Sequence, residues 1–227
     1  SLFNISTKEV KKLDKIKIPD QFGIQNNLNN DDIIKEFNKI FKPVLNNFYI
    51  AFGATKIVLI NDVNSYVIKI PFNGEWETSN TFIDFIGAND TTNQKAEKWD
   101  YCSNEYIKYQ NAITNGFENF FPETKLLTYA GRFPLYIQEQ AEVFWDHSDL
   151  SYVSKNNLKR YEKSNTCKQS FLNKDWVLAA INYYGLEETE KFIRYAEDHD
   201  LLDDMHEDNL GFCEYFPVFL DWAGYYE

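Results

Sequence analysis

Basic residues are few in this sequence. Its 227 residues include 23 Lys and Arg against 35 Asp and Glu, so the formal net charge is −12. A chain this acidic lacks the broad basic face with which proteins bind nucleic acids or anionic membranes. No apolar run approaches the roughly 18 residues of a membrane helix, and no signal peptide opens the sequence. We therefore expect neither a nucleic acid nor a membrane as a partner.

Cysteine is also scarce and widely spaced. The sequence contains Cys102, Cys167 and Cys213, and no two of them form a CxxC pair. This spacing excludes a disulfide framework and a zinc knuckle. We expect reduced thiols in a cytoplasmic protein.

Apolar residues, in contrast, are plentiful: 44% of the chain is hydrophobic and 17% is aromatic, which is enough for a packed core. Periodicity and turn residues predict an alternation of helices and hairpins. The expected elements are helices within 7–46 (N-cap Asp31 or Asp32, stop at Pro43), a hairpin of 47–60 with 65–72, a loop over 73–93, a helix over 94–114, a second hairpin over 123–141, a flexible crossing over 145–172, and helices over 174–185 and 186–200.

A lysine, Lys69, stands in the strand-like segment YVIKI at the end of the first hairpin. Side chains alternate along a strand, so Val67 lies on the same face. Phosphoryl transfer requires a cation that holds the phosphates, which makes Lys69 a candidate for that role and Val67 a candidate for covering an adenine. Gly53 would let the backbone approach the phosphates.

A glutamate on the following helix is expected to pair with Lys69. Glu105, in SNEYIKYQ, is the first choice, and Glu97 on nearly the same helical face is the alternative. The apolar face of this helix is expected to consist of Ala96, Trp99, Cys102, Tyr106, Tyr109 and Ile113.

The segment DDMHEDNLGF at 203–212 is the most specific pattern of the chain. Asp204 and Asn209 have the spacing D-x-x-x-x-N, and Asp221 ends the apolar run PVFLD twelve residues after Asn209. A phosphotransferase needs a base beside the accepting hydroxyl and acids or amides that bind Mg²⁺. Asp204 fits the first role, and Asn209 and Asp221 fit the second.

Together, DMHEDNLGF and PVFLDW resemble the protein-kinase-like superfamily, in particular aminoglycoside phosphotransferases, toxin-type serine kinases and small kinase-like proteins of phages. The resemblance by motif spans residues 48–227 and is specific over the last 24. It implies an α+β, bilobal fold with a β-rich N-lobe, a helical C-lobe and an ATP cleft between them. Lys69, Glu105 and Asp204 would be its catalytic residues, with ATP and Mg²⁺ as cofactors.

The same resemblance suggests how the chain is organised. A helical extension over 1–46 would precede the N-lobe at 47–140, and the C-lobe with its catalytic loop would occupy 141–227. Adenine would be read by backbone groups of the connector QEQA, at Glu139 and Gln140.

The sequence departs from the family pattern in two places. Leu202 replaces the histidine that usually stands two residues before the catalytic aspartate, and His206 takes an inner position. Six residues follow Asp221, so we expect either a minimal, truncated C-lobe or a partner protein that supplies the rest of it. The acceptor would be an unknown small molecule or a protein Ser/Thr hydroxyl.

Two other interpretations stay open. A catalytically silent kinase fold would bind nucleotide, or a protein, without transferring phosphate. A metal-dependent hydrolase would use Asp200, Asp204, His206 and Asp208 as ligands. The hydrolase interpretation gives no role to Lys69, Glu105 or Asp221.

Overall fold

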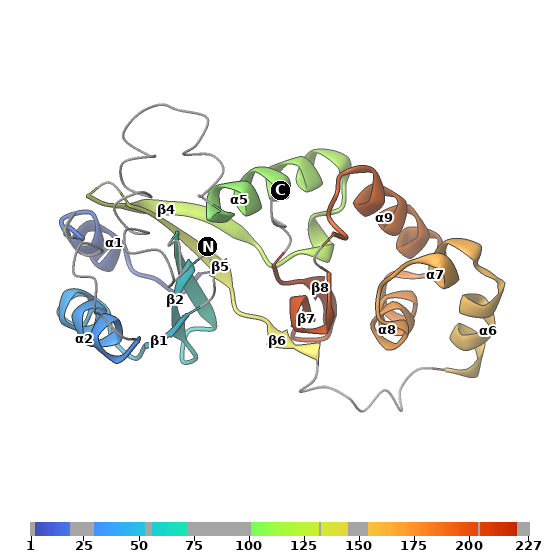
Figure 1. Cartoon of the computed structure of the whole chain (residues 1–227), viewed down its shortest axis with the longest axis horizontal. Helices are drawn as coiled ribbons and strands as arrows, with labels where there is room; N and C mark the ends of the chain where they lie inside the picture. The colour runs from blue at the N-terminus through green and yellow to red at the C-terminus, as the bar shows by residue number, and fades with distance from the viewer. Residues whose placement is uncertain are drawn as a thin grey trace. The chain divides into compact units, whose positions relative to one another are not determined.

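The computed structural model describes residues 3–18, 30–52, 56–71, 101–131, 133–144, 154–203 and 205–221. Over these residues the protein is a mixed α+β structure (Figure 1). The chain divides into two compact units: Ser1–Ile107 with Thr124–Gln140, and Lys108–Glu123 with Ala141–Glu227. They are called the N-terminal and C-terminal units below. The expected boundaries of lobes at 47–140 and 141–227 stay a prediction, because this division reports compactness alone.

An antiparallel sheet of order β1-β2-β3-β5-β4 forms the centre of the N-terminal unit. Its sequences are rich in Ile, Val, Tyr and Phe, which favour strands. Residues 62–65 connect β2 to β3, and Gly131 (φ +69°) follows β4 in a left-handed conformation that glycine adopts without strain. The strands are β1 (Tyr49–Phe52), β2 (Lys56–Asn61), β3 (Tyr66–Pro71), β4 (Thr124–Ala130) and β5 (Phe133–Glu139).

One face of this sheet is aliphatic and packs against two helices, α1 (Thr7–Leu13) and α2 (Asn30–Phe41). A capping box starts α1, in which the Ser6 hydroxyl accepts from the Glu9 N–H and the Glu9 carboxylate accepts from the Ser6 N–H. The buried residues of this layer include Leu13, Phe37, Phe41, Ile57, Leu59, Tyr66, Ile68, Ile70, Leu135 and Ile137.

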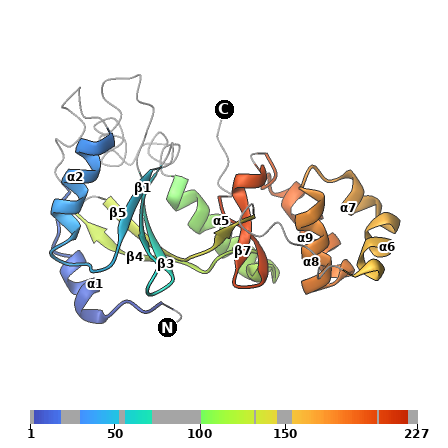
Figure 2. The same cartoon turned by 90° about the horizontal axis from the view of Figure 1, so that it is seen from below.

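A third helix, α5 (Tyr101–Asn115), lies on the opposite face of the sheet, as Figure 2 shows. Its Tyr106 ring contacts Tyr136 of β5 at 5.8 Å between centroids. The first seven residues of α5 belong to the N-terminal unit, and the remainder belongs to the C-terminal unit. The sheet is therefore the middle of three layers.

In the C-terminal unit a helical group and a small sheet share one aromatic core. Ring contacts join Trp176, Phe192 and Phe219, and all three side chains are fully buried. The small sheet has the order β6-β7-β8. The elements are η2 (Glu118–Phe120), α6 (Lys155–Lys163), α7 (Asn165–Gln169), α8 (Lys174–Tyr184), α9 (Leu186–Asp198), η4 (Glu207–Asn209), β6 (Glu142–Val143), β7 (Leu210–Cys213) and β8 (Phe216–Phe219).

Several expected elements are present with the expected ends. The helix α2 ends two residues before Pro43, and α8 ends before Gly185, whose φ is +90°. The hairpin of β4 and β5 turns at the expected Gly131. The expected loop over 73–93 and Glu97 lie outside the described residues.

Four expectations were wrong. The run 47–60 was expected as one strand of a hairpin. Its second part, β2, does form that hairpin with β3, but β1 ends at Phe52 and β2 begins at Lys56, so the run contains two paired strands. Residues 155–169 form helices α6 and α7 rather than a flexible crossing, with the hydroxyls of Ser154 and Ser164 accepting from backbone N–H groups at their starts. Asp31 and Asp32 lie within the first turn of α2, where the helix dipole favours acids, instead of capping it. Ile113 is exposed, and Ala112 takes the buried position.

No helix in the described part of the chain is long and apolar enough to cross a bilayer. Cys102, Cys167 and Cys213 are all buried, and no disulfide joins any two of them.

Candidate functional site

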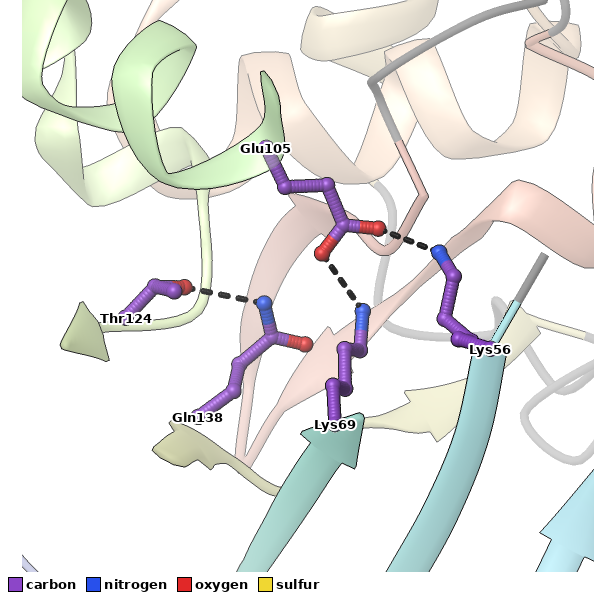
Figure 3. A network of polar contacts seen from close by, with 5 residues as sticks. All are labelled: Lys56, Lys69, Glu105, Thr124 and Gln138. Carbon is purple, nitrogen blue, oxygen red and sulfur yellow. Dashed lines mark hydrogen bonds and ion pairs between the residues drawn. The ribbon is translucent and has the colours of Figure 1, made fainter. Parts of the chain in front are cut away.

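Lys69 and Glu105 form a buried ion pair in the N-terminal unit. The Lys69 Nζ lies 2.8 Å from the Glu105 Oε2, and the two residues are 7% and 1% exposed (Figure 3). Strand β3 directs Lys69 to the face that α5 covers, and Glu105 points down from the second turn of α5. The pairing of Lys69 with Glu105 expected from the sequence is therefore present.

Lys56 is a third member of this cluster that sequence reasoning missed. Its Nζ lies 2.5 Å from the Glu105 Oε1, and the residue is 4% exposed. In the register of β2 with β3, Val58 is opposite Lys69, so Lys56 stands two residues along on the same face. A count back from the turn at 62–65 would have found this position.

Burial sets the electrostatics of the cluster. An ion pair out of water interacts several times more strongly than one on the surface, but both partners lose hydration when they are buried. Here one carboxylate binds two ammonium groups, with a different oxygen for each. Each lysine therefore holds the carboxylate in the orientation that the other lysine uses.

The same face of the sheet continues with Val67 and Gln138. Val67 is buried and lies opposite Gln138 in the register, two residues before Lys69 and on the same face, as expected. The Gln138 Nε2 donates to the Thr124 Oγ1 at 2.9 Å, and both residues are buried (Figure 3). This hydrogen bond ties the start of β4 to the end of β5.

The connector after β5 uses part of its backbone internally. The Gln140 N–H donates to the Ser65 carbonyl at 3.0 Å, and its side chain donates to Asp62. Glu139 is opposite Tyr66, so its side chain lies on the face opposite Lys69. A nucleotide read at this connector would therefore use backbone groups other than the Gln140 N–H.

In the C-terminal unit, Asn209 and Asp221 are brought to one end of the β7–β8 hairpin. Leu210 pairs with Phe219, and the Leu220 N–H donates to the Asn209 carbonyl at 2.9 Å. Asn209 thus directly precedes β7, and Asp221 follows β8 by two residues at the same open end. The hairpin therefore places the two residues at the same end although twelve positions separate them in the sequence.

Gly211 in the segment NLGF is required by close packing of backbone. A Cβ at this position would lie 2.3 Å from the Glu142 carbonyl oxygen of β6 and 2.8 Å from a methyl carbon of Leu220. The pairing of β6 with β7 therefore needs glycine here.

Buried anchors hold the loop that precedes Asn209. Leu201, Met205 and Leu210 enter the core of the C-terminal unit, and polar residues stand between them. The His206 Nε2 lies 3.3 Å from the Asn209 Nδ2, so His206 positions the amide rather than standing alone. Leu202 packs partly buried against the same core.

Two cavities flank this loop. One of about 510 Å³ is lined by Phe171, Asn173, Met205, His206, Glu207 and Asp208. Another of about 730 Å³ shares Phe171, Met205 and His206 with it and adds Glu197, Asp200, Leu202 and Asp203. The Asn173 side chain donates to Glu207 at 2.6 Å and accepts from two N–H groups at the start of α8, which ties the loop to that helix.

Lys108 of α5 is influenced by the same loop. Burial lowers the pKa of Lys108, and the nearby carboxylates of Asp200 and Asp203 act in the opposite direction. An acidic loop thus lies close enough to a half-buried cation to favour its charged form.

The metal-hydrolase alternative finds no support in the described residues. Among them, no three His, Cys, Asp or Glu side chains come together as a set of metal ligands. His206 and Asp208 approach to 3.7 Å only. Asp204 and Gly53 lie outside the described residues, so their predicted roles stay predictions.

Comparison of the chain with protein-family models, curated proteins and solved structures found no match.

Proposed function

We propose that this chain is a kinase-like phosphotransferase that binds ATP with Mg²⁺ and transfers the γ-phosphate to a hydroxyl acceptor. In this proposal the N-terminal and C-terminal units correspond to the lobes of a bilobal kinase-like fold. The observation that supports it most is the buried Lys69–Glu105 pair, in which a lysine of β3 meets a glutamate of α5. In protein kinases a lysine on a strand of the N-lobe pairs with a glutamate on a helix, and the lysine holds the ATP phosphates.

Stability alone does not explain this pair. A buried ion pair contributes little more than a well-packed apolar pair of similar volume, since the desolvation of both charges offsets their attraction. Ionisable groups placed at such a cost are frequent at functional sites. The pair joins a hairpin strand to the next helix that the structure describes, which is the position expected for a phosphate-binding lysine.

Asn209 and Asp221 are the proposed Mg²⁺ ligands. Carboxylate and amide oxygens are ligands that Mg²⁺ accepts, and the β7–β8 hairpin brings both residues to one end. The Asn209 Nδ2 faces His206, so Oδ1 is the amide atom that would bind the metal. Asp204 would accept the proton of the attacking hydroxyl.

Nucleotide binding is tested first, by thermal unfolding with ATP and MgCl₂. A ligand that binds only the folded state stabilises it by RT ln(1 + [L]/Kd), about 2.7 kcal/mol at a hundredfold excess over Kd. We expect a Mg²⁺-dependent shift that Asp221→Asn removes. Glu214→Gln, in the turn at the other end of the same hairpin, is the control and should keep the shift. No shift in the wild type at millimolar ATP would exclude the proposal.

Transfer is tested with γ-labelled ATP. Asp204→Ala should keep ATP binding and lose about 10²- to 10⁴-fold in transfer rate, as the loss of a general base does, whereas Asp203→Ala should keep both. ATP binding without transfer by the wild type would favour the silent alternative, in which Leu202 replaces the usual histidine as a packing residue.

A further inference from the structure

The cluster around Glu105 contains one lysine more than the proposed function uses. Lys56 lies on β2, and its ammonium group binds the Glu105 Oε1, while Lys69 binds Oε2 (Figure 3). Both lysines are nearly inaccessible to water, so neither is an ordinary surface charge.

We propose that Lys56 is a second phosphate-binding residue, so that the site holds a polyphosphate with two ammonium groups that share one carboxylate. The proposal rests on the proposed function, since it assigns Lys56 to the ATP site of Lys69. The expected ligand of the two lysines is a nucleoside di- or triphosphate.

The register of the sheet places Lys56 near Lys69. Lys56 is opposite Pro71 and Val58 is opposite Lys69, so the two lysines are diagonal neighbours on one face of adjacent strands. Diagonal positions on a sheet are about 7–8 Å apart at Cα, within reach of long side chains. A phosphate that contacts the Lys69 ammonium group therefore lies within reach of Lys56.

The position of Lys56 along its strand agrees with this role. It is the first residue of β2, three residues after Gly53, the proposed point of approach of the backbone to the phosphates. A glycine-rich loop would supply several backbone N–H donors there, but this sequence offers one glycine. A lysine at the start of β2 supplies charge and three N–H donors at the same end of the strand.

Stability does not account for Lys56. Burial of a second ammonium group adds a further desolvation cost, and an apolar side chain of similar volume would fold as well or better. Two ammonium groups brought together on one carboxylate are, in contrast, placed to contact a ligand that carries several negative charges. A monophosphate can contact one lysine, whereas a triphosphate can contact both.

The test is calorimetric titration of the full chain with Mg·ATP, AMP and inorganic tripolyphosphate. Lys56→Met keeps the side-chain volume and removes the charge. It should weaken ATP and tripolyphosphate roughly 10- to 100-fold, the range for one hydrogen bond to a charged group, and change AMP affinity less than about threefold. Lys69→Met should weaken ATP at least as much. Lys125→Met, at an exposed position of β4, is the matched control and should leave all three affinities unchanged.

The outcomes separate this inference from the proposed function. Weak ATP binding in Lys69→Met together with wild-type affinity in Lys56→Met would overturn the role of Lys56 and leave the proposed function standing. An equal loss for ATP and AMP would mean a distorted site and would also overturn it. Lys56→Gln, a second neutral variant that can still donate to Glu105, must reproduce the selective loss. A wild type that binds neither ATP nor tripolyphosphate would overturn both proposals.

Discussion

The two faces of the five-stranded sheet carry opposite chemistry although the same strands supply both. Strand β3 sends Ile68 and Ile70 to the aliphatic layer against α1 and α2, and it sends Val67 and Lys69 to the face under α5. Alternation along the strand produces this division. Every residue of β3 is buried, so the difference between the faces lies in charge and not in exposure.

The two faces are therefore expected to contribute differently to the stability of the N-terminal unit and to ligand binding. Removal of apolar surface from water contributes about 25 cal/mol per Å², and the aliphatic face consists almost entirely of such surface. The face under α5 instead loses free energy to the desolvation of Lys56, Lys69 and Glu105. The first face is therefore expected to control stability, and the second is expected to control ligand binding.

Glu105→Ala is expected to have the largest effect, because it leaves two buried ammonium groups without this carboxylate. Loss of one partner from a buried ion pair costs about 3–5 kcal/mol. Urea unfolding should show that loss, and ATP binding should disappear with it.

The control replaces all three charges together, as Lys56→Met, Glu105→Leu and Lys69→Met. This variant should recover most of the stability, since a buried ionic cluster and an apolar cluster of equal volume differ little. It should not recover ATP binding. A triple variant as unstable as Glu105→Ala would contradict the separation of the two faces.

Ile68→Ala tests the aliphatic face. The side chain is fully buried, and its truncation should cost about 2–5 kcal/mol through lost burial and a residual cavity. ATP affinity, measured well below the unfolding midpoint, should stay within about threefold of the wild type. Val63→Ala, at an exposed position in the β2–β3 turn, should cost less than about 0.5 kcal/mol. A selective loss of ATP binding in Ile68→Ala would show that the faces are coupled.

Gln138→Met is expected to have a smaller effect on the polar face. It removes the donor to Thr124 and leaves a buried hydroxyl without that partner, which costs about 1–3 kcal/mol. The double variant Thr124→Val, Gln138→Met should be more stable than Gln138→Met alone, because both polar groups are then gone. Unfolding free energies of the three variants in a mutant cycle measure this coupling, and simple additivity would show that the hydrogen bond contributes nothing.

Local patterns were sufficient to predict the α+β class and the pairing of Lys69 with Glu105. The strand YVIKI and the helix around Glu105 are each defined by residues close in sequence, so their facing side chains could be inferred. Lys56 was missed because the run 47–60 has continuous strand character, and only the register places Lys56 beside Lys69. Such a register depends on the partner strand as well as on the strand itself.

Helices α6 and α7 could not be predicted from hydrophobic periodicity. They are short and polar, and their buried residues include only Asn157 in α6 and Cys167 in α7. Tertiary contacts hold them, such as the hydrogen bond from Asn157 to Asn182 of α8. The pairing of LGFC with FPVF was likewise hidden, because both four-residue strands are short apolar runs without the alternation that identifies a strand.

The last and smallest effect concerns pH on the aliphatic face, where Tyr66 is buried. Burial raises the pKa of the Tyr66 phenol above its ordinary value of 10.0, more than the hydrogen bond from Asn61 lowers it, and Glu9 raises it further. The folded state therefore keeps the proton at a pH where the unfolded state loses it. The resulting stability is complete below the ordinary pKa and is lost as the pH rises through the folded-state pKa.

Tyr66→Phe lacks this contribution to the free energy of unfolding, so its stability relative to the wild type should increase from about pH 8 to about pH 11. Urea unfolding at both pH values measures the change, with Tyr129→Phe, at a half-exposed position of β4, as the control for loss of a phenol. Parallel stability curves for the wild type and Tyr66→Phe would show that the phenol is as well hydrated in the folded state as in the unfolded state.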